Sequence, residues 1–133
     1  MTESEKALLW QSASDARKNA YAPYSGFSVG AALLSEDGRI FSGCNVENAA
    51  YSPTLCAERV ALGAAVAAGA RRFTAVAVIG GRGDVLADAS PCGVCRQMLS
   101  EFTSGGGMIV LFLEGGERKE CTLADLVPHS FHL

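Results

Sequence analysis

The sequence lacks the features that mark several special classes of protein. Its longest segment without a charged residue, residues 19–35, is interrupted by proline and glycine, whereas a membrane-spanning helix needs about 20 mostly apolar residues. Hydrophobic residues make up 49% and charged residues 19%, which excludes a disordered chain. A length of 133 residues leaves no room for separate cofactor and substrate lobes. We therefore expect no membrane segment and one folded domain, residues 1–133.

Basic residues are also scarce. There are 11 Lys and Arg against 14 Asp and Glu, a net charge of −3, and they form no basic stripe of the kind that polymeric nucleic acid requires. The first residues lack the basic start and apolar middle of a secretory signal, so a cytoplasmic location is expected. Five cysteines in such a chain argue against a disulfide framework and for thiols that pack, bind metal or react.

Apolar periodicity predicts alternating helices and strands. Spacings of three and four predict a helix over residues 3–20 with Ser4 as its cap. Alternation over residues 27–33 predicts a strand with one buried face, paired in a hairpin with a second strand at 39–46. The remaining expected elements are a helix buried between layers at 56–68, an inner strand at 73–79, a helix at 92–102, a strand at 108–113, a short edge strand at 119–122 and a helical turn at 123–126.

The order of these elements indicates the fold class. Continuous apolar strands and a buried helix need cover on both faces of a sheet. We therefore predict an α/β fold: a three-layer α/β/α sandwich with a mixed sheet of about five strands.

Three cysteines stand at the starts of predicted helices. Cys56 begins one helix, while Cys92 and Cys95 lie at the start of the next. A helix amino terminus carries partial positive charge and free N–H groups, which favour the thiolate that a metal needs. Taken alone, the Cys-x-x-Cys pair fits a structural zinc site and a redox pair equally well. With the remote Cys56, three sulfurs would leave one position of a tetrahedral zinc ion open.

Glu58 favours a catalytic ion over a structural one. Structural zinc is closed by four protein ligands, whereas catalytic zinc keeps three and binds water. Glu58 lies two residues after Cys56 in the first helical turn, within reach of the proton of such a water. Cys44 and Cys121 lie in strand-like apolar contexts, which favours packing over metal binding. His129 and His132 lie at the carboxyl end with no partner motif and are not expected to be ligands.

Four segments in order carry a family resemblance. They are residues 21–32 (YAPYSGFSVGAA), 43–49 (GCNVENA), 56–59 (CAER) and 91–97 (PCGVCRQ). Together they resemble the small, homotetrameric, zinc-dependent cytidine deaminases of the cytidine and deoxycytidylate deaminase family. The resemblance implies one Zn²⁺ per subunit, held by the cysteines at 56, 92 and 95, and a nucleoside as substrate.

The implied reaction is hydrolysis of the cytosine amino group. Zinc-bound hydroxide attacks C4 while Glu58 moves a proton to N3 and later to the departing ammonia. Three thiolates leave the zinc site with a net charge of about −1. Something must therefore withdraw electron density from sulfur, and Arg59 resembles the arginine that hydrogen-bonds the cysteine ligands in this family.

The resemblance also implies residues that bind the substrate. Asn45 and Glu47 match the pair that holds the ribose hydroxyls, and alternation along a strand end would point both side chains the same way. Phe27 matches the ring that packs against the pyrimidine, and the backbone around Ala57 matches part of the wall that reads the base. Tyr51 and Phe131 match residues that enter a neighbouring subunit's pocket in family tetramers. From the residues alone, Phe27 would be a core residue. For the other three a binding role is matched equally well by an ordinary one, with Asn45 as a strand terminator, Glu47 as a solvated charge and Tyr51 as a loop aromatic.

The primary prediction is a cytidine and 2′-deoxycytidine deaminase of pyrimidine salvage, acting as a cytoplasmic homotetramer. One alternative is a deaminase for a cytosine-containing antibiotic such as blasticidin S, against which the sugar-binding segment 45–47 argues. A second alternative is a non-enzymatic module in which Cys44 or Cys121 closes a four-thiolate zinc site. A polynucleotide-editing deaminase is disfavoured by the negative net charge.

Overall fold

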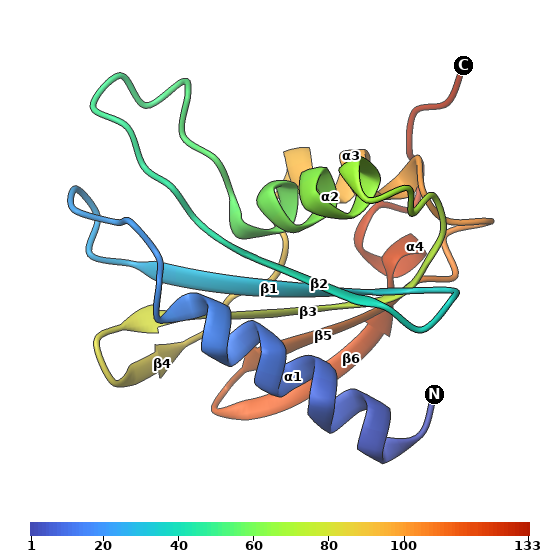
Figure 1. Ribbon diagram of the computed structural model, residues 1–133, viewed down its shortest axis with the longest axis horizontal. Coiled ribbons are helices and arrows are strands. Elements are labelled where there is room, and N and C mark those ends of the chain that lie inside the picture. Colours follow the sequence, from blue (N-terminus) through green and yellow to red (C-terminus); the bar gives the residue numbers. More distant parts are fainter.

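The computed structural model describes residues 1–133 and shows a sheet with helices on both faces (Figure 1). The elements are α1 (Glu3–Arg17), β1 (Ser28–Ser35), β2 (Ile40–Cys44), α2 (Ala57–Ala67), β3 (Phe73–Arg82), β4 (Val85–Ala87), α3 (Gly93–Ser100), β5 (Ile109–Glu114), β6 (Glu117–Thr122) and α4 (Leu123–Leu126). The α/β prediction is thus confirmed, and no helix has both the length and the apolar character needed to cross a membrane.

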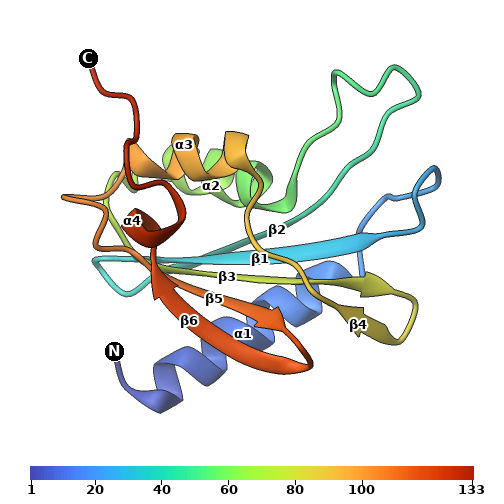
Figure 2. The same ribbon diagram turned by 180° about the vertical axis from the view of Figure 1, so that it is seen from behind.

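The sheet is mixed and has six strands, where about five were predicted. Five of them follow the order β2-β1-β3-β5-β6, and β4 folds back onto the end of β3. Only β3 and β5 run parallel, and all other pairs are antiparallel. Seen from behind, β6 lies at one edge of the sheet and the β3–β4 hairpin extends beyond its end (Figure 2). The strand missed by sequence reasoning is therefore the short β4.

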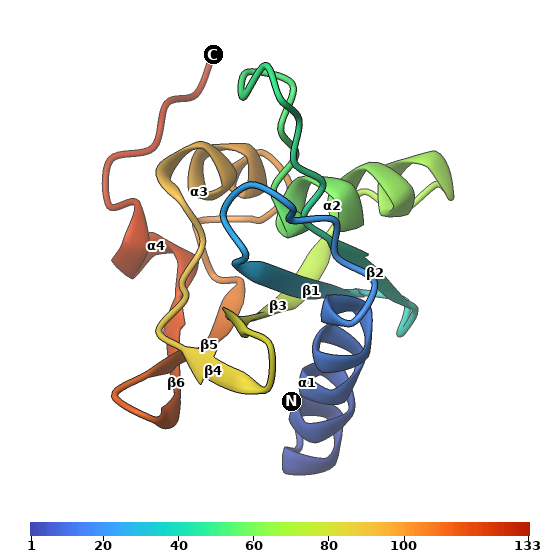
Figure 3. The same cartoon turned by 90° about the vertical axis from the view of Figure 1, so that its left-hand side faces the viewer.

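The helices form two layers, with α1 on one face of the sheet and α2 and α3 on the other (Figure 3). Leu9 and Ala13 of α1 pack with Ala32 and Leu34 of β1 in one core. The second core contains the alternate β1 residues Ala31 and Leu33, together with the buried side of α2. The prediction that this strand buries one face is therefore wrong: both faces of β1 are covered by helices.

The first helix begins earlier than its predicted cap. Thr2, not Ser4, is the N-cap: its side chain accepts a hydrogen bond from the Glu5 amide at 3.1 Å, and Glu5 Oε1 accepts one from the Thr2 amide at 3.2 Å. This reciprocal capping box satisfies two amides that the first turn leaves free. The helix ends at Arg17, three residues before its predicted end.

Helix α2 is covered on one side only. Ala57, Ala61 and Ala65 are buried against the sheet, whereas Ala64 and Ala67 are exposed. The prediction of a helix buried between layers is therefore wrong for the single chain, because the outer side of α2 has no further layer over it. The helix lies directly on β2 at Gly43, where an added Cβ would stand 2.5 Å from the Ala61 nitrogen.

Candidate metal centre and adjoining pocket

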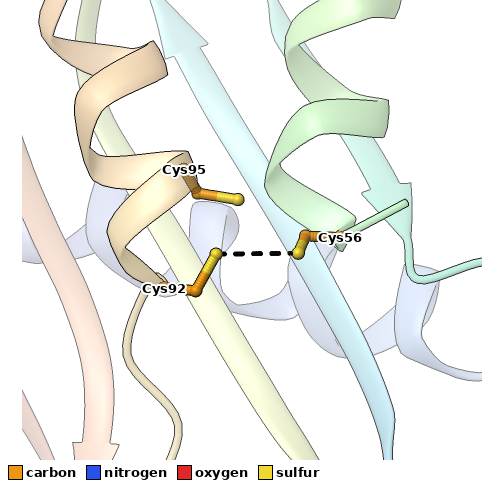
Figure 4. A group of neighbouring side chains, drawn as sticks. All are labelled: Cys56, Cys92 and Cys95. Atoms are coloured by element: carbon orange, nitrogen blue, oxygen red, sulfur yellow. Dashed lines mark hydrogen bonds between the residues drawn. The ribbon is translucent and has the colours of Figure 1, made fainter. Parts of the chain in front are cut away.

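Three cysteine sulfurs converge where α2 and α3 begin (Figure 4). Cys56 is the N-cap of α2, Cys92 is the N-cap of α3, and Cys95 lies in the first turn of α3. The three sulfurs all lie within 4.8 Å of one another, and the Sγ atoms of Cys56 and Cys92 are 3.7 Å apart. Two thiolates bound at ~2.3 Å to a tetrahedral zinc ion are ~3.8 Å apart. Neither N-cap sulfur is used in capping its helix, so the donor set fits zinc.

Two thiols of the cysteine cluster have pKa values shifted in opposite directions. Hydrogen bonding from Cys95 lowers the pKa of Cys56 to about 5, and Cys92 and Arg59 add to this shift. The pKa of Cys95 is raised, first because its thiol donates to Cys56 and then because it is buried and lies near Glu58. Cys56 therefore ionises more readily than Cys95. A metal ion bound by all three sulfurs would replace their remaining protons.

Arg59 lies beside this cluster with one donor unused. Its Nη2 donates to the backbone oxygen of Thr54 at 2.7 Å, but its buried Nε has no hydrogen-bond partner. A buried donor without an acceptor costs free energy. If the cysteine sulfurs become thiolates on metal binding, they would place negative charge next to the Arg59 Nε. The unpartnered donor therefore also fits a metal site here.

Glu58 is the one acidic residue buried in the core. It is only 3% exposed, and burial raises the pKa of its carboxyl to about 7, with the charge of Cys56 adding to the effect. A carboxyl group with a pKa near neutrality can both accept and release a proton. Its position in the first turn of α2 places it next to the sulfur cluster.

A cavity of about 350 Å³ joins these groups to the predicted substrate residues. Such a volume is suited to a small molecule. Thirteen residues line the cavity, and eight of them are hydrophobic. The thirteen are Phe27, Val29, Asn45, Thr54, Leu55, Cys56, Ala57, Glu58, Val78, Asp88, Ala89, Ser90 and Cys92. Sequence-predicted residues from four separate segments therefore share one cavity.

Comparison with known proteins identifies the family. The model of the cytidine and deoxycytidylate deaminase zinc-binding region matches residues 3–111. The chain belongs to the cytidine and deoxycytidylate deaminase family. It is 51% identical over 116 residues to a cytidine deaminase of Sporosarcina psychrophila, covering 87% of this chain and 83% of that one. It is 42% identical over 133 residues to the cytidine deaminase of Mycobacterium tuberculosis, covering 100% and 94%.

A solved structure supports the same assignment. The crystal structure of a cytidine deaminase from Burkholderia pseudomallei superimposes with a TM-score of 0.83 at 43% identity, covering 98% of this chain and 100% of that one. The predicted zinc cofactor is confirmed by the zinc-binding family region together with the three-cysteine group. The family assignment and the enzyme class predicted from the sequence are likewise confirmed.

No fourth protein ligand joins the cysteine group of this deaminase-family chain. Cys44 ends β2 and Cys121 lies on β6, where it packs against the second core. Neither belongs to the group of ligand atoms around Cys56, and no His, Asp or Glu does. A closed four-thiolate module is therefore not favoured.

Asn45 and Glu47 contact two different cavities. The Asn45 side chain is buried and binds the start of β1, accepting from the Val29 amide at 2.8 Å and donating to the Phe27 oxygen at 2.9 Å. Glu47 lines a second cavity of about 390 Å³ with Tyr24, Ser25, Tyr51 and Thr54. Hydrogen bonds, chiefly from Ser25, lower the pKa of Glu47 and keep it ionised. Thr54 lines both cavities, so they adjoin.

The two aromatic residues predicted to enter a neighbouring subunit do not line the cavity of about 350 Å³ that contains Glu58. Tyr51 is 76% exposed and has a φ of 54°, the only positive φ outside glycine. Phe131 is 67% exposed on the carboxyl-terminal tail. The Gln97 side chain holds that tail, donating to the Phe131 oxygen at 2.8 Å and accepting from its amide at 2.9 Å. Both aromatic rings thus remain available to another molecule.

Sequence reasoning missed one wall of the cavity. Residues 88–90, between β4 and α3, line it, and they carry no motif beyond their position before the Cys-x-x-Cys pair. Arg96 fixes this segment: its Nη2 donates to Ser90 Oγ at 3.2 Å and its Nε to the Pro91 oxygen at 2.6 Å. The sequence signal that could have pointed to this wall is Arg96, which lies in the last of the four family segments.

Proposed function

We propose that this chain hydrolyses cytidine and 2′-deoxycytidine to uridine and 2′-deoxyuridine with release of ammonia. The observation that carries the proposal is the shared cavity, which is lined by Cys56 and Cys92 of the three-sulfur cluster, by the buried Glu58 and by Phe27. The names of the curated relatives support the same activity. A cytoplasmic location, a single domain over residues 1–133 and a role in pyrimidine salvage belong to this proposal.

Each step of the reaction has a candidate residue. Cys56, Cys92 and Cys95 would hold the zinc ion, which supplies the Lewis acidity that makes water a nucleophile near neutral pH. Glu58 takes a proton from the attacking water, passes it to N3 of the base and then to the leaving ammonia. Its burial beside the sulfurs supports this role. Arg59 acts on the cysteines and not on the substrate.

Nucleoside binding divides between the two adjoining cavities. Phe27 would pack against the base, with the backbone at Ala57 reading its edge, in the cavity that contains Glu58. Asn45 and Glu47 would hold the sugar, at the point where this cavity meets the second one. Both polar side chains keep unused hydrogen-bonding capacity for hydroxyl groups.

We propose a homotetramer in which neighbouring chains complete the site. Tyr51 and Phe131 are large, mostly exposed aromatic residues, and neither lines the cavity that contains Glu58. The uncovered alanines of α2 are a further surface that a second copy would cover. Sedimentation of an active monomer would contradict this part.

The function is tested with Glu58→Gln and, as a control, Glu36→Gln at an exposed turn outside the cavity. Loss of the proton carrier should lower cytidine turnover by about 100- to 10,000-fold while zinc content stays unchanged. The control should retain full turnover. A non-enzymatic zinc module would show no cytidine turnover in the unchanged chain, and Glu58→Gln would leave its behaviour the same. Faster turnover of blasticidin S than of cytidine would favour the antibiotic deaminase.

A further inference from the structure

The ring of Phe27 is held from the β3–β4 hairpin. The guanidinium carbon of Arg82, at the end of β3, lies 5.7 Å from the centroid of the Phe27 ring. Gly80 on the same strand touches the ring directly, since an added Cβ there would stand 2.7 Å from Phe27 Cε1. A cation over an aromatic face at this distance is attractive. The strand end therefore provides both a contact without a side chain, at Gly80, and a charge over the ring, at Arg82.

The same arginine holds the segment that contacts Glu47. Arg82 Nη1 donates to the Ser25 oxygen, and Ser25 Oγ donates to Glu47 Oε2. The Ser25 amide also donates to Glu47 Oε1 at 3.1 Å, and the Phe27 amide donates to Ser25 Oγ at 2.9 Å. Ser25 thus links the carboxylate to the aromatic residue, and Arg82 fixes Ser25 from outside.

We propose that Arg82 is a positioning residue that sets the nucleoside-binding geometry through Phe27 and Ser25. The inference rests on the proposed function, in which Phe27 contacts the base and Glu47 the sugar. Arg82 itself is exposed and lines neither cavity. It acts on substrate binding and not on proton transfer, because its contacts end on the binding residues and none reaches the cysteines or Glu58.

The chain contains a matched control. Arg39 lies 5.1 Å from the centroid of the Phe41 ring, and its Nη1 donates to the Ala68 oxygen at 3.1 Å. This is the same pair of interactions, an aromatic face and a backbone carbonyl, at residues that line neither cavity. Any loss of general stability from removing such an arginine will appear in both variants.

The test compares Arg82→Met with Arg39→Met by steady-state kinetics with cytidine. We expect Arg82→Met to raise KM by about threefold to tenfold with kcat within about twofold, and Arg39→Met to leave both unchanged. Zinc content should be unchanged in both. Arg82→Lys keeps a cation that can donate to Ser25, so its KM should lie between those of Arg82→Met and the unchanged chain. An unchanged KM in Arg82→Met, or a fall in kcat without a rise in KM, would overturn the inference.

A binding measurement separates this inference from the proposed function. Calorimetry with cytidine on the Glu58→Gln background should show the same threefold to tenfold loss of affinity on adding Arg82→Met and none on adding Arg39→Met. Normal turnover by the unchanged chain together with equal affinities would overturn the positioning role alone. Absence of both turnover and cytidine binding in the unchanged chain would overturn the proposed function and the inference with it.

Discussion

Replacing Gly43 with alanine should separate helix α2 from the sheet. The added Cβ would lie 2.5 Å from the Ala61 nitrogen and 2.8 Å from the Ala57 oxygen. Both are backbone atoms of α2, so no side-chain rotation can relieve the overlap. Because optimal carbon contacts lie at ~3.5–4.0 Å, the start of α2 would have to retreat by about 1 Å. That end of the helix carries Cys56 and Glu58, and a retreat from the sheet displaces both relative to α3.

The size of the effect follows from known overpacked cores. Extra methylenes in a packed core cost about 1–3 kcal/mol of unfolding free energy. For a chain of this length, each kcal/mol corresponds to about 3–5 °C in Tm. The matched control is Gly63→Ala in the same helix, where an added Cβ meets nothing within 4 Å. Alanine is favoured over glycine in a helix by about 0.8–1.0 kcal/mol, so this variant should gain stability.

Calorimetric Tm values and competition for zinc against a chelator would measure both effects. Gly43→Ala should lower Tm and weaken zinc retention, whereas Gly63→Ala should raise Tm and leave zinc retention unchanged. If both substitutions raised Tm, or if Gly43→Ala bound zinc as tightly as the unchanged chain, the close approach of α2 to β2 would not control the metal site.

Two further predictions concern the tail and the cysteines. Gln97→Leu removes both hydrogen bonds to Phe131, so amide hydrogen exchange at Phe131 should quicken by at least about tenfold. Gln11→Leu, which removes one exposed amide contact to Asp15, should not change it. Unchanged tail exchange in Gln97→Leu would show that other contacts hold the tail. Cys95→Ala should abolish stoichiometric zinc binding, whereas Cys121→Ala should retain it, as measured by elemental analysis. Loss of zinc in Cys121→Ala would instead support the four-thiolate module.

The long apolar segments were predictable, and the short exposed strand was not. The predicted strand at 73–79 and helices at 56–68 and 92–102 match β3, α2 and α3 within three residues at each end. Their sequence pattern is strong because α2 and α3 each pack one side in a core and β3 packs both of its sides. Strand β4 has only three residues, and its Val85 is 72% exposed. It is held by main-chain pairing to β3, and three residues are too few to show the alternation that marks a strand.

The metal centre was also more predictable than the substrate pocket. Two helix starts carrying cysteines need only pack side by side on one sheet face to bring their sulfurs together. Asn45 and Glu47, in contrast, were expected to follow strand alternation beyond Cys44, where β2 has ended. Isolated bridges from Val46 to Tyr21 and Leu55 fix the backbone there instead. Such contacts depend on the tertiary fold, as does the placement of Arg82 over Phe27.

The positions of the cysteines also relate stability to metal supply. An ion held by Cys56 and Cys92 joins two points 36 residues apart in the chain, much as a disulfide would. A disulfide persists in the unfolded chain, however, whereas an exchangeable ion leaves it. Its stabilisation therefore follows mass action and grows with the logarithm of the free ion concentration. In a zinc-starved cell, the same polypeptide would spend more time unfolded and be degraded sooner.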